Sequence, residues 1–581
     1  MPRSVCFEAE SATNSAGRPD IFDAVTLALG PRSSERPADA GWTLVAGLEG
    51  TAPVLVDGGG LASPLGADWT LDWWVGADDR WHFPAREPAV RQRRIGHGPI
   101  VETSLRVPSG DVIHTAYPVV VPGGVATIIE ITNDSPVPVA LAMAIRPYSV
   151  DTARPVPQTN RRVDFGADDL VMLDGAHALQ LPRRPNEAGG SVTEDLLDIL
   201  TDGQTVSWPG SLDGPSANAA LLYPLPHRTS LRFAILGPGV TQANLESLPD
   251  ATSSARGWTA VVDNASRFQF PDSGVSDLAG AARARLLLAA PDLPAAVVGG
   301  APGVAQILAG LAFGGYQLEL RRALDAFAQS FPTSVTSAAD GAWLVEGIGL
   351  AAETLGDADL AQDLLEPASQ LTHLTERQAK KQRKDPAAQR AAAQARLGLS
   401  RLVALAGQAE AAAQLAAESK FEPEAADLDV VTALAEAAAP SLRFHGPGFA
   451  DSAAPDSTDP DSAVAAAEFW LAARGLLLRS GTSTDQGLPL VELLPGFPTA
   501  WLGGTVETHR APVAGARISF AIRWHGYRPA LLWEVESSRP IALSCPGLDP
   551  QWTTTEAKGE ALLAGVADEL PTAPMPGDSF N

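Results

Sequence analysis

The chain contains very little cysteine. Its 581 residues include only Cys6 and Cys545, and neither stands in a motif with the spacing of metal ligands. A disulfide framework needs several cysteines, and a structural zinc site needs Cys or His residues clustered at short spacing. We therefore expect no disulfide framework and no bound metal.

Cofactor-binding motifs and long apolar runs are also missing. The chain lacks GxGxxG, GxxxxGK, GxSxG and HExxH, so we expect no cofactor. The most apolar stretches, such as residues 286 to 300, are interrupted by Asp and Pro well before the roughly 20 residues that a membrane span requires. The N-terminus has no apolar core of the kind found in signal peptides. These absences predict a cytoplasmic protein that does not insert into a membrane.

Positive charge is scarce relative to negative charge. The chain has 42 Lys and Arg against 68 Asp and Glu, which gives a net charge of -26 and a pI near 4.7. Because the acids are spread along the whole chain, we expect them to serve solubility, and nucleic acid and anionic membranes are poor partners. With 45% hydrophobic and 19% charged residues, the composition is that of a globular protein, and the length predicts roughly two to four domains.

Residues 1 to 239 show the pattern of a large antiparallel β-sandwich. Short runs rich in Val, Ile, Leu and Thr alternate with clusters of Pro, Gly and Asp, a spacing typical of strands and turns. Residues 125 to 132 and 137 to 145 are two such runs, joined by the sequence NDSP. Asn and Asp can cap their own turn, and Pro136 cannot continue a ladder. We predict a hairpin at this point.

The hydrophobic period then changes. Residues 240 to 275 read as a helical linker that ends in an extended piece around Phe268 and Phe270, with Asp272 as a candidate N-cap for the next helix. Residues 276 to 486 carry apolar residues three and four apart, which predicts a block of packed helices. Residues 487 to 581 alternate again and predict a small C-terminal β-layer with a frayed tail. The predicted fold class is multidomain α+β.

Three motifs accompany this order of regions. The first, VELLPGFPTAWLGGTVETHRAP at residues 491 to 512, combines prolines, Trp501 and a double glycine; the others cover residues 340 to 360 and 256 to 289. Together they resemble the six-hairpin α/α-toroid glycosidase superfamily, which includes glucoamylase-like, maltose-phosphorylase-like and fucosidase- or rhamnosidase-like enzymes. We interpret the first motif as a joint where the prolines stop the last helix and Trp501 packs against it.

The resemblance implies glycoside hydrolysis in an α/α toroid of twelve helices, with catalytic carboxylates on its loops. Residues 276 to 480 are too few for twelve helices of ordinary length. We therefore expect a partial or compressed toroid, in which the carboxylates of the superfamily cannot be located by position alone.

Inverting glycoside hydrolysis needs a protonated carboxyl and a second carboxylate about 6.5–9.5 Å away that activates water. Glu346 is the candidate acid because Trp343, one helical turn away, could desolvate it and stack on a sugar. Asp340 could bind a sugar hydroxyl. The alternatives are a surface glutamate beside a core tryptophan and, for Asp340, a helix N-cap. Glu468 is the candidate base. Glu492 and Glu507 are further candidates, and ion pairs with Arg474 or Arg510 explain all three glutamates as well as catalysis does.

A second candidate site is the aromatic and acidic segment at residues 65 to 84, LGADWTLDWWVGADDRWHFP. Aromatic rings can stack on the C–H face of a sugar while carboxylates accept its hydroxyls. The same tryptophans could instead form sandwich core, and this alternative stays open. The candidate substrate-binding residues of the segment are Trp69, Asp72, Trp73, Trp74, Asp78, Asp79 and Trp81.

The resulting hypothesis is a glycoside hydrolase-like protein that acts on an oligo- or polysaccharide. One alternative is a catalytically silent relative that binds a glycan or another protein. Another is a glycoside phosphorylase, which needs an anion pocket. The backbone amides of HGPGF, residues 445 to 449, are a candidate for that pocket, with an ordinary loop as the alternative. The oligomeric state stays open, a homo-oligomer included.

Overall fold

The computed structural model describes residues 42–48, 53–146, 148–149, 154–155, 160–166, 168–192, 204–205, 210–215, 217–293, 301–329, 331, 337–419, 460–481, 484, 487–513, 515–526 and 528–564. The described residues form two compact units, one within residues 42–258 and the other within residues 259–564. The strands predicted before residue 42 and the HGPGF segment lie outside the described residues.

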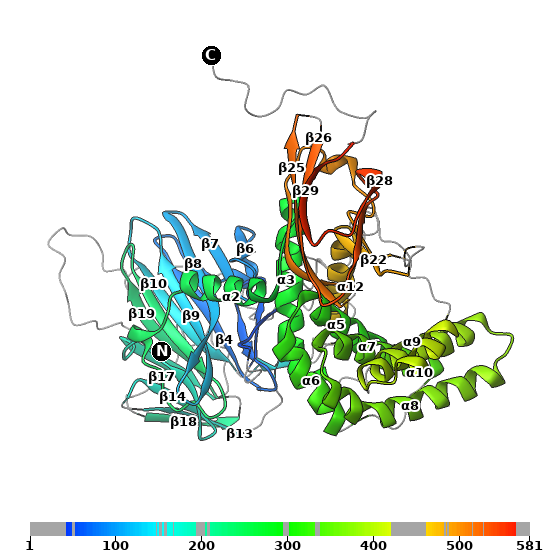
Figure 1. Cartoon of the computed structure of the whole chain (residues 1–581). Helices are drawn as coiled ribbons and strands as arrows, with labels where there is room; N and C mark the ends of the chain where they lie inside the picture. Colours follow the sequence, from blue (N-terminus) through cyan, green and yellow to red (C-terminus); the bar gives the residue numbers. More distant parts are fainter. Residues whose placement is uncertain are drawn as a thin grey trace, which may run out of the picture. The chain divides into compact units, whose positions relative to one another are not determined.

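The first unit is a β-sandwich (Figure 1) whose two large sheets, within the described residues, have nine antiparallel strands each. In spatial order, the first sheet contains β1 (Trp42–Val45), β2 (Val54–Asp57), β3 (Ala62–Pro64), β4 (Thr70–Gly76), β10 (Val139–Arg146), β19 (Asn218–Leu225), β16 (Glu187–Ser191) and β17 (Gln204–Thr205), with β5 (Trp81–His82) on β4. The second contains β18 (Gly210–Pro215), β13 (Asn160–Phe165), β14 (Leu170–Leu173), β15 (Ala176–Gln180), β20 (Ser230–Leu236), β9 (Gly124–Asn133), β8 (Gly110–Val121), β7 (Val101–Val107) and β6 (Val90–Arg94). A two-stranded ribbon pairs β11 (Tyr148–Ser149) with β12 (Arg154–Pro155).

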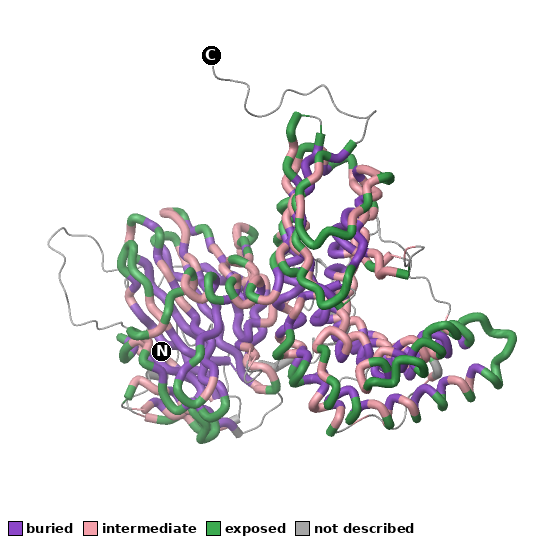
Figure 2. Tube along the Cα trace, viewed as in Figure 1, coloured by how far each residue is buried: buried purple, intermediate pink, exposed green. Residues whose placement is uncertain are grey.

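The sandwich core lies between these sheets. Apolar side chains from both sheets form one buried cluster, and Figure 2 shows the strands of the sandwich mostly in purple, the colour of buried residues. Tyr223 of β19 and Phe233 of β20 meet edge to face with ring centroids 5.4 Å apart, so this pair joins the two sheets. The alternation that predicted a sandwich arises because successive residues of a strand point to opposite faces, and the prediction is confirmed.

The hairpin predicted at NDSP is wrong. Strand β9 pairs with β8 and β20, whereas β10 pairs with β4 and β19 in the other sheet. The turn chemistry itself is as expected, since Asn133 Oδ1 accepts a hydrogen bond from the Ser135 N–H at 2.9 Å. Such a turn reverses the chain whether or not the flanking strands pair. Local sequence therefore did not distinguish a hairpin from a connection between sheets.

The linker contains a 3₁₀ turn, η3 (Leu245–Ser247), then helix α2 (Ala251–Ala265) and strand β21 (Arg267–Gln269). Helix α3 (Ser273–Ala289) follows, and Asp272 caps it by accepting a hydrogen bond from the Val275 N–H at 3.0 Å. The extended piece at Phe268 and the cap at Asp272 are both confirmed. The acidic residue satisfies an amide that has no partner inside the helix.

The second unit contains, among its described residues, α3 and seven further α-helices. These are α5 (Ala301–Gly314), α6 (Gln317–Gln329), α7 (Ala338–Leu355), α8 (Ala358–Lys381), α9 (Pro386–Leu405), α10 (Ala409–Ala417) and α12 (Pro460–Gly475). Helix α7 packs against α5, α8 and α9, while α12 packs against α3 and α5. The all-helical middle region is confirmed. No helix of the described residues is both long and apolar enough to cross a membrane.

The second unit ends in two small sheets, as the predicted C-terminal β-layer requires. One has the order β21, β24 (Val506–Val513), β25 (Ala516–His525), β26 (Arg528–Glu536) and β29 (Lys558–Leu562). The other has the order β22 (Leu478–Ser480), β23 (Leu490–Leu493), β27 (Ala542–Cys545) and β28 (Asp549–Thr554). Strand β21 comes from the linker, so the chain enters this sheet before it forms the helices.

The motif at residues 491 to 512 is not a joint between a helix and a sheet, as we had interpreted it. Helix α12 ends at Gly475, and the motif runs from β23 through the 3₁₀ turn η5 (Thr499–Trp501) into β24. Trp501 contacts the rings of Phe270 and Phe497 at centroid distances of 6.0 and 6.2 Å. The prolines therefore separate two strands, where they end ladder pairing rather than a helix.

Candidate functional site

The candidate acid Glu346 lies on a half-exposed face of α7. Trp343, Glu346, Leu350 and Glu353 follow each other at spacings of three, four and three residues, so they share one side of the helix, and each is half-buried. Leu350 and Glu353 also line a pocket of about 420 Å³ near the C-terminal end of α7. A second pocket, of about 410 Å³, is lined by Ala339 near its N-terminal end. This face, called the α7 face below, is partly exposed at each of these four residues.

Two polar residues of α9 hold the Glu346 carboxylate. The Gln394 Nε2–H donates a hydrogen bond to Glu346 Oε2, and Arg401 Nη1 lies 4.0 Å from Glu346 Oε1. The Nε atom of the same arginine lies 3.3 Å from Glu353 Oε2. Arg401 therefore lies between two carboxylates that are two helical turns apart. Gln394 and Arg401 were not predictable from the sequence, because a pattern within α7 does not reveal which helix packs against it.

Burial is the main influence on Glu346. It raises the pKa of this carboxyl above its usual value, while the Gln394 hydrogen bond and the Arg401 charge oppose the rise without cancelling it. Desolvation disfavours the charged form of a carboxyl. The side chain nevertheless remains 19% exposed. A carboxyl that keeps its proton more firmly and still reaches solvent has the properties of a general acid.

Close helix packing brings these groups together. A Cβ atom on Gly398 of α9 would lie 2.5 Å from the Cα of Glu346, and a Cβ on Gly349 of α7 would lie 2.2 Å from the Gly398 carbonyl oxygen. Both distances are far inside van der Waals contact, so only glycine permits α7 and α9 to cross this closely. The short crossing distance explains how Gln394 reaches the Glu346 carboxylate.

Asp340 does not cap α7. The N-cap is Ser337, whose Oγ accepts a hydrogen bond from the Asp340 N–H at 3.2 Å and donates one to Asp340 Oδ2 at 2.9 Å. A helix cap therefore does form at this turn, but Ser337 provides it and Asp340 does not. Ser337 lines the pocket near the N-terminal end of the α7 face, beside Ala339. Asp340 itself is half-buried, and its role as a sugar ligand stays a prediction.

The predicted base Glu468 lies on α12, where it is half-buried and accepts a hydrogen bond from Gln306 Nε2 of α5 at 3.0 Å. Glu346 and Glu468 therefore contact different helices, α9 and α5. The other two candidates form ion pairs in the sheets. Glu492 lies 2.6 Å from Arg479 Nε, and Glu507 pairs with Arg523 at 3.1 Å. Hydrogen bonding from His509 is the largest cause of a lowered pKa at Glu507.

The tryptophans of residues 65 to 84 are buried in the sandwich. Trp73 and Trp81 are 0% and 1% exposed, and Trp69 and Trp74 are only slightly more so. The indole N–H of Trp73 donates to the Gly59 carbonyl at 2.9 Å, and this ring lies 5.4 Å from the ring of His114. Stacking requires an accessible ring face, so the burial favours the core alternative that the sequence left open.

The acids of this segment have separate environments. Asp72 in β4 is buried, and its Oδ2 accepts a hydrogen bond from Arg146 of β10 at 3.1 Å. Asp68 pairs with Arg161, and Asp78 is exposed. Buried carboxylates need such partners, because an unpaired buried charge is costly. The pairing of Asp72 explains why an acid stands between tryptophans in a strand that is buried along its whole length.

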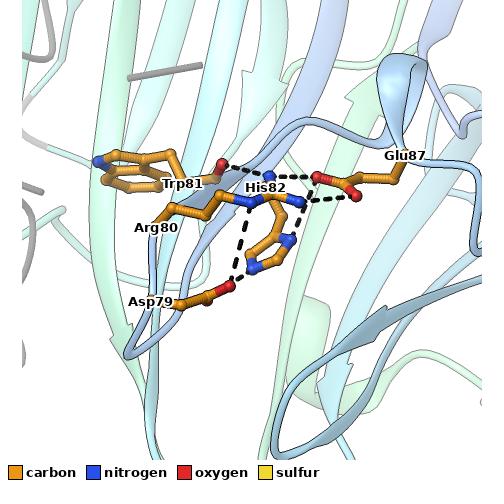
Figure 3. Close-up of polar contacts among 5 residues, drawn as sticks. All are labelled: Asp79, Arg80, Trp81, His82 and Glu87. Atoms are coloured by element: carbon orange, nitrogen blue, oxygen red, sulfur yellow. Dashed lines mark hydrogen bonds and ion pairs between the residues drawn. The ribbon is translucent and has the colours of Figure 1, made fainter. Parts of the chain in front are cut away.

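Asp79 belongs to a polar cluster at the turn between β4 and β5, which Figure 3 shows. His82 Nε2 lies 2.9 Å from Asp79 Oδ1, and His82 Nδ1 lies 3.2 Å from Glu87 Oε1. Arg80 forms a two-pronged contact with Glu87, one bond of which measures 3.0 Å. Burial raises the pKa of Glu87, but the Arg80 hydrogen bond and charge, with His82, lower it overall.

The carboxylates of this cluster do not converge on one point, since Asp79 and Glu87 contact opposite edges of the imidazole ring (Figure 3). The arrangement links the β4–β5 turn to the 3₁₀ turn η2 (Pro84–Arg86) that follows β5. Its geometry supports a structural role. Across the described part of the chain, no group of three or more His, Cys, Asp or Glu residues is placed to hold a metal ion.

No protein-family model and no curated protein matches this chain. Solved structures do match. One is a bacterial glucoamylase complexed with acarbose, with 10% identity and a TM-score of 0.45, covering 68% of each chain. Another is a glycosyl hydrolase of family GH92, with 11% identity and a TM-score of 0.35, covering 69% of this chain and 63% of that one. Likeness at this level assigns no residue roles, so the site rests on the geometry of this chain.

Proposed function

We propose that this chain is a glycoside hydrolase-like protein in which Glu346 is the general acid that cleaves an oligo- or polysaccharide. One observation carries the proposal: burial raises the pKa of Glu346, yet the residue lies on the half-exposed α7 face beside Trp343. The face lies between two pockets, which suits an extended ligand better than a small one. The order of a sandwich, a helical region and a C-terminal β-layer is the architecture that the sequence resemblance implies.

In the proposed mechanism, Glu346 protonates the leaving oxygen of the glycosidic bond. The Gln394 amide orients the carboxyl through its hydrogen bond to Oε2, which leaves Oε1 to carry the proton. Arg401 stabilises the carboxylate after the proton has left, because it lies 4.0 Å from Oε1. Trp343, half-buried one turn away, supplies a ring face for a sugar.

The inverting mechanism also needs a base. Glu468 is the residue that the sequence analysis favoured. Glu353 is a second choice that the structure adds, because it shares Arg401 with Glu346 and lines the adjacent pocket. Seven residues of α-helix separate its Cα from that of Glu346 by about 10.5 Å along the axis, and the side chains can shorten or lengthen the carboxylate separation. Comparing variants of these two glutamates decides between them.

The test is hydrolysis of glucans and aryl glycosides by the full chain and by Glu346→Gln. Losing a general acid costs about 10²–10⁴ in rate. Glu366→Gln is the matched control, because Glu366 is an exposed glutamate of α8, and we expect it to keep the full rate. Equal rates for the two variants would refute the role of Glu346.

A catalytically silent glycan-binding protein is the second candidate function. One observation favours it: the two predicted catalytic carboxylates, Glu346 and Glu468, accept hydrogen bonds from different helices, α9 and α5. Oligosaccharides would bind to a protein of this kind and quench the fluorescence of Trp343. The protein would release no reducing sugar from any substrate. Turnover of any glycan that depends on Glu346 would exclude it.

A further inference from the structure

The pocket of about 420 Å³ at the C-terminal end of the α7 face lies wholly within the second unit. Its walls come from the ends of α5 and α7, the start of α6, the turn between β24 and β25, and the residues after β26. The apolar part is formed by Phe313, Leu350, Pro512 and Val513. This volume falls within the range of about 300–1,000 Å³ that is usual for small-molecule sites.

Three charged side chains line the pocket: Glu353, Glu536 and Arg517. Both carboxylates are already paired, Glu353 with Arg401 at 3.3 Å and Glu536 with Arg510 at 3.5 Å. Glu536 stands opposite Arg517 in the β25–β26 register, yet no hydrogen bond or ion pair joins the Arg517 guanidinium to any residue that the structure describes. Among the described residues, the pocket lining thus holds two carboxylates that already form ion pairs and one arginine that does not.

A second uncompensated cation lies behind the apolar wall. Arg474 of α12 is 4% exposed, donates a hydrogen bond to the Pro512 carbonyl at 2.6 Å and lies 4.1 Å from the centre of the Phe313 ring. Burial lowers its pKa to about 9, so it stays charged at neutral pH. Within the described residues no carboxylate pairs with it. The apolar wall between Arg474 and the pocket has a low dielectric constant, so the charge of Arg474 is weakly screened and acts on the pocket.

The remaining polar groups favour a hydroxylated ligand. Gln317, Thr354, Ser537 and Ser538 line the pocket with amide and hydroxyl groups that can both donate and accept hydrogen bonds. The two paired carboxylates can accept further bonds from ligand hydroxyls. A bare inorganic anion would use Arg517 and leave most of these groups without a partner.

We propose that this pocket binds a small hydroxylated organic anion, a monosaccharide bearing a carboxylate or phosphate group, with the anionic group on Arg517. This inference does not depend on hydrolysis at Glu346. The net charge of -26 repels anions from the chain as a whole, so affinity for an anion must come from a local site. The unpaired guanidinium provides that site, and the planar group suits bidentate contact with an oxyanion.

The test is calorimetric titration of the full chain with glucose 6-phosphate, glucuronate, glucose and inorganic phosphate. We expect at least one of the two sugar anions to bind about tenfold or more tightly than either glucose or inorganic phosphate. Arg517→Gln should weaken that anion about tenfold or more, because it removes a charge-assisted hydrogen bond. The control is Arg523→Gln on the same strand, since Arg523 pairs with Glu507 outside the pocket.

The proposal is overturned if glucose binds as tightly as both sugar anions, or if inorganic phosphate matches them. It is also overturned if Arg517→Gln, folded by its thermal transition, binds the anion as the control does. The comparison of ligands on the unmodified chain needs no variant, so it decides the question even where Arg517→Gln does not fold. Arg517→Lys, which keeps the charge but not the fork, should retain part of the affinity.

Discussion

At the scale of single residues, several buried charges among the described residues have a partner of opposite charge. Asp72 has Arg146 in the sandwich, and Arg283 of α3 has Asp263, which lies 3.0 Å away. Glu346 differs, because its nearest cation is 4.0 Å away and its closest partner is a neutral amide. An amide only partly offsets desolvation of a carboxylate. Ionising Glu346 therefore costs free energy in the folded state.

The cost predicts a pH-dependent stability. Because the folded pKa of Glu346 is raised above its ordinary value of 4.5, its contribution to stability is intact below the unfolded pKa and is lost as the pH rises through the folded pKa. Glu346→Gln imitates the protonated form at every pH. In urea unfolding we expect this variant to be more stable than the unmodified chain at about pH 7 and equal to it at about pH 4. The same difference at both pH values would show that the effect is packing rather than ionisation.

Residue patterns located the candidate acid but not its surroundings. Glu346 stood out because a carboxyl and a tryptophan one turn apart share a helix face, and this is local information. Gln394, 48 residues further on, became relevant only through the packing of α9. The tryptophans of β4 could not be assigned from sequence because the strand is buried on both faces, which alternation alone does not reveal.

At the scale of elements, the glycines at the α7–α9 crossing give the clearest expectation. Gly398→Ala would place a Cβ 2.5 Å from the Glu346 Cα, so α9 must move, and overpacking of this kind costs about 1–3 kcal/mol. Gly257→Ala is the control, because that helical glycine in α2 has open space around its Cβ position. The control should gain up to about 1 kcal/mol, since alanine favours helix. Thermal unfolding measures both, and equal stability of the two variants would show that the helices do not cross this closely.

The sequence predicted which segments form helices and strands, but it did not predict which strands pair with each other. The period of 3.6 identified the helical region, and α7 ends at Gly356, whose φ of 68° is a left-handed conformation that commonly follows the last turn of a helix. The connection at NDSP and the motif at residues 491 to 512 were misinterpreted for one shared reason. A turn or a proline shows that an element ends, but which sheet receives the chain depends on contacts distant in sequence.

At the scale of the whole molecule, each unit contains its own core. The sandwich core joins both large sheets, and the second unit encloses a separate set of buried residues that includes Trp470 and Phe469 of α12. The order of sandwich, helices and β-layer followed from the hydrophobic period. The return of β21 into the C-terminal sheet did not, since three residues are too few for a periodic signal.

Separate cores predict separate unfolding. Calorimetry of the full chain should give an unfolding enthalpy larger than the van't Hoff enthalpy, the sign of more than one cooperative unit. Two variants assign the transitions. Trp73→Ala removes a fully buried ring from the sandwich, at a cost of about 3–5 kcal/mol, and should lower one transition, while Gly398→Ala should lower the other. If both variants shift a single shared transition by amounts that follow their costs, the chain unfolds as one cooperative unit, and the division into two cores has no thermodynamic meaning.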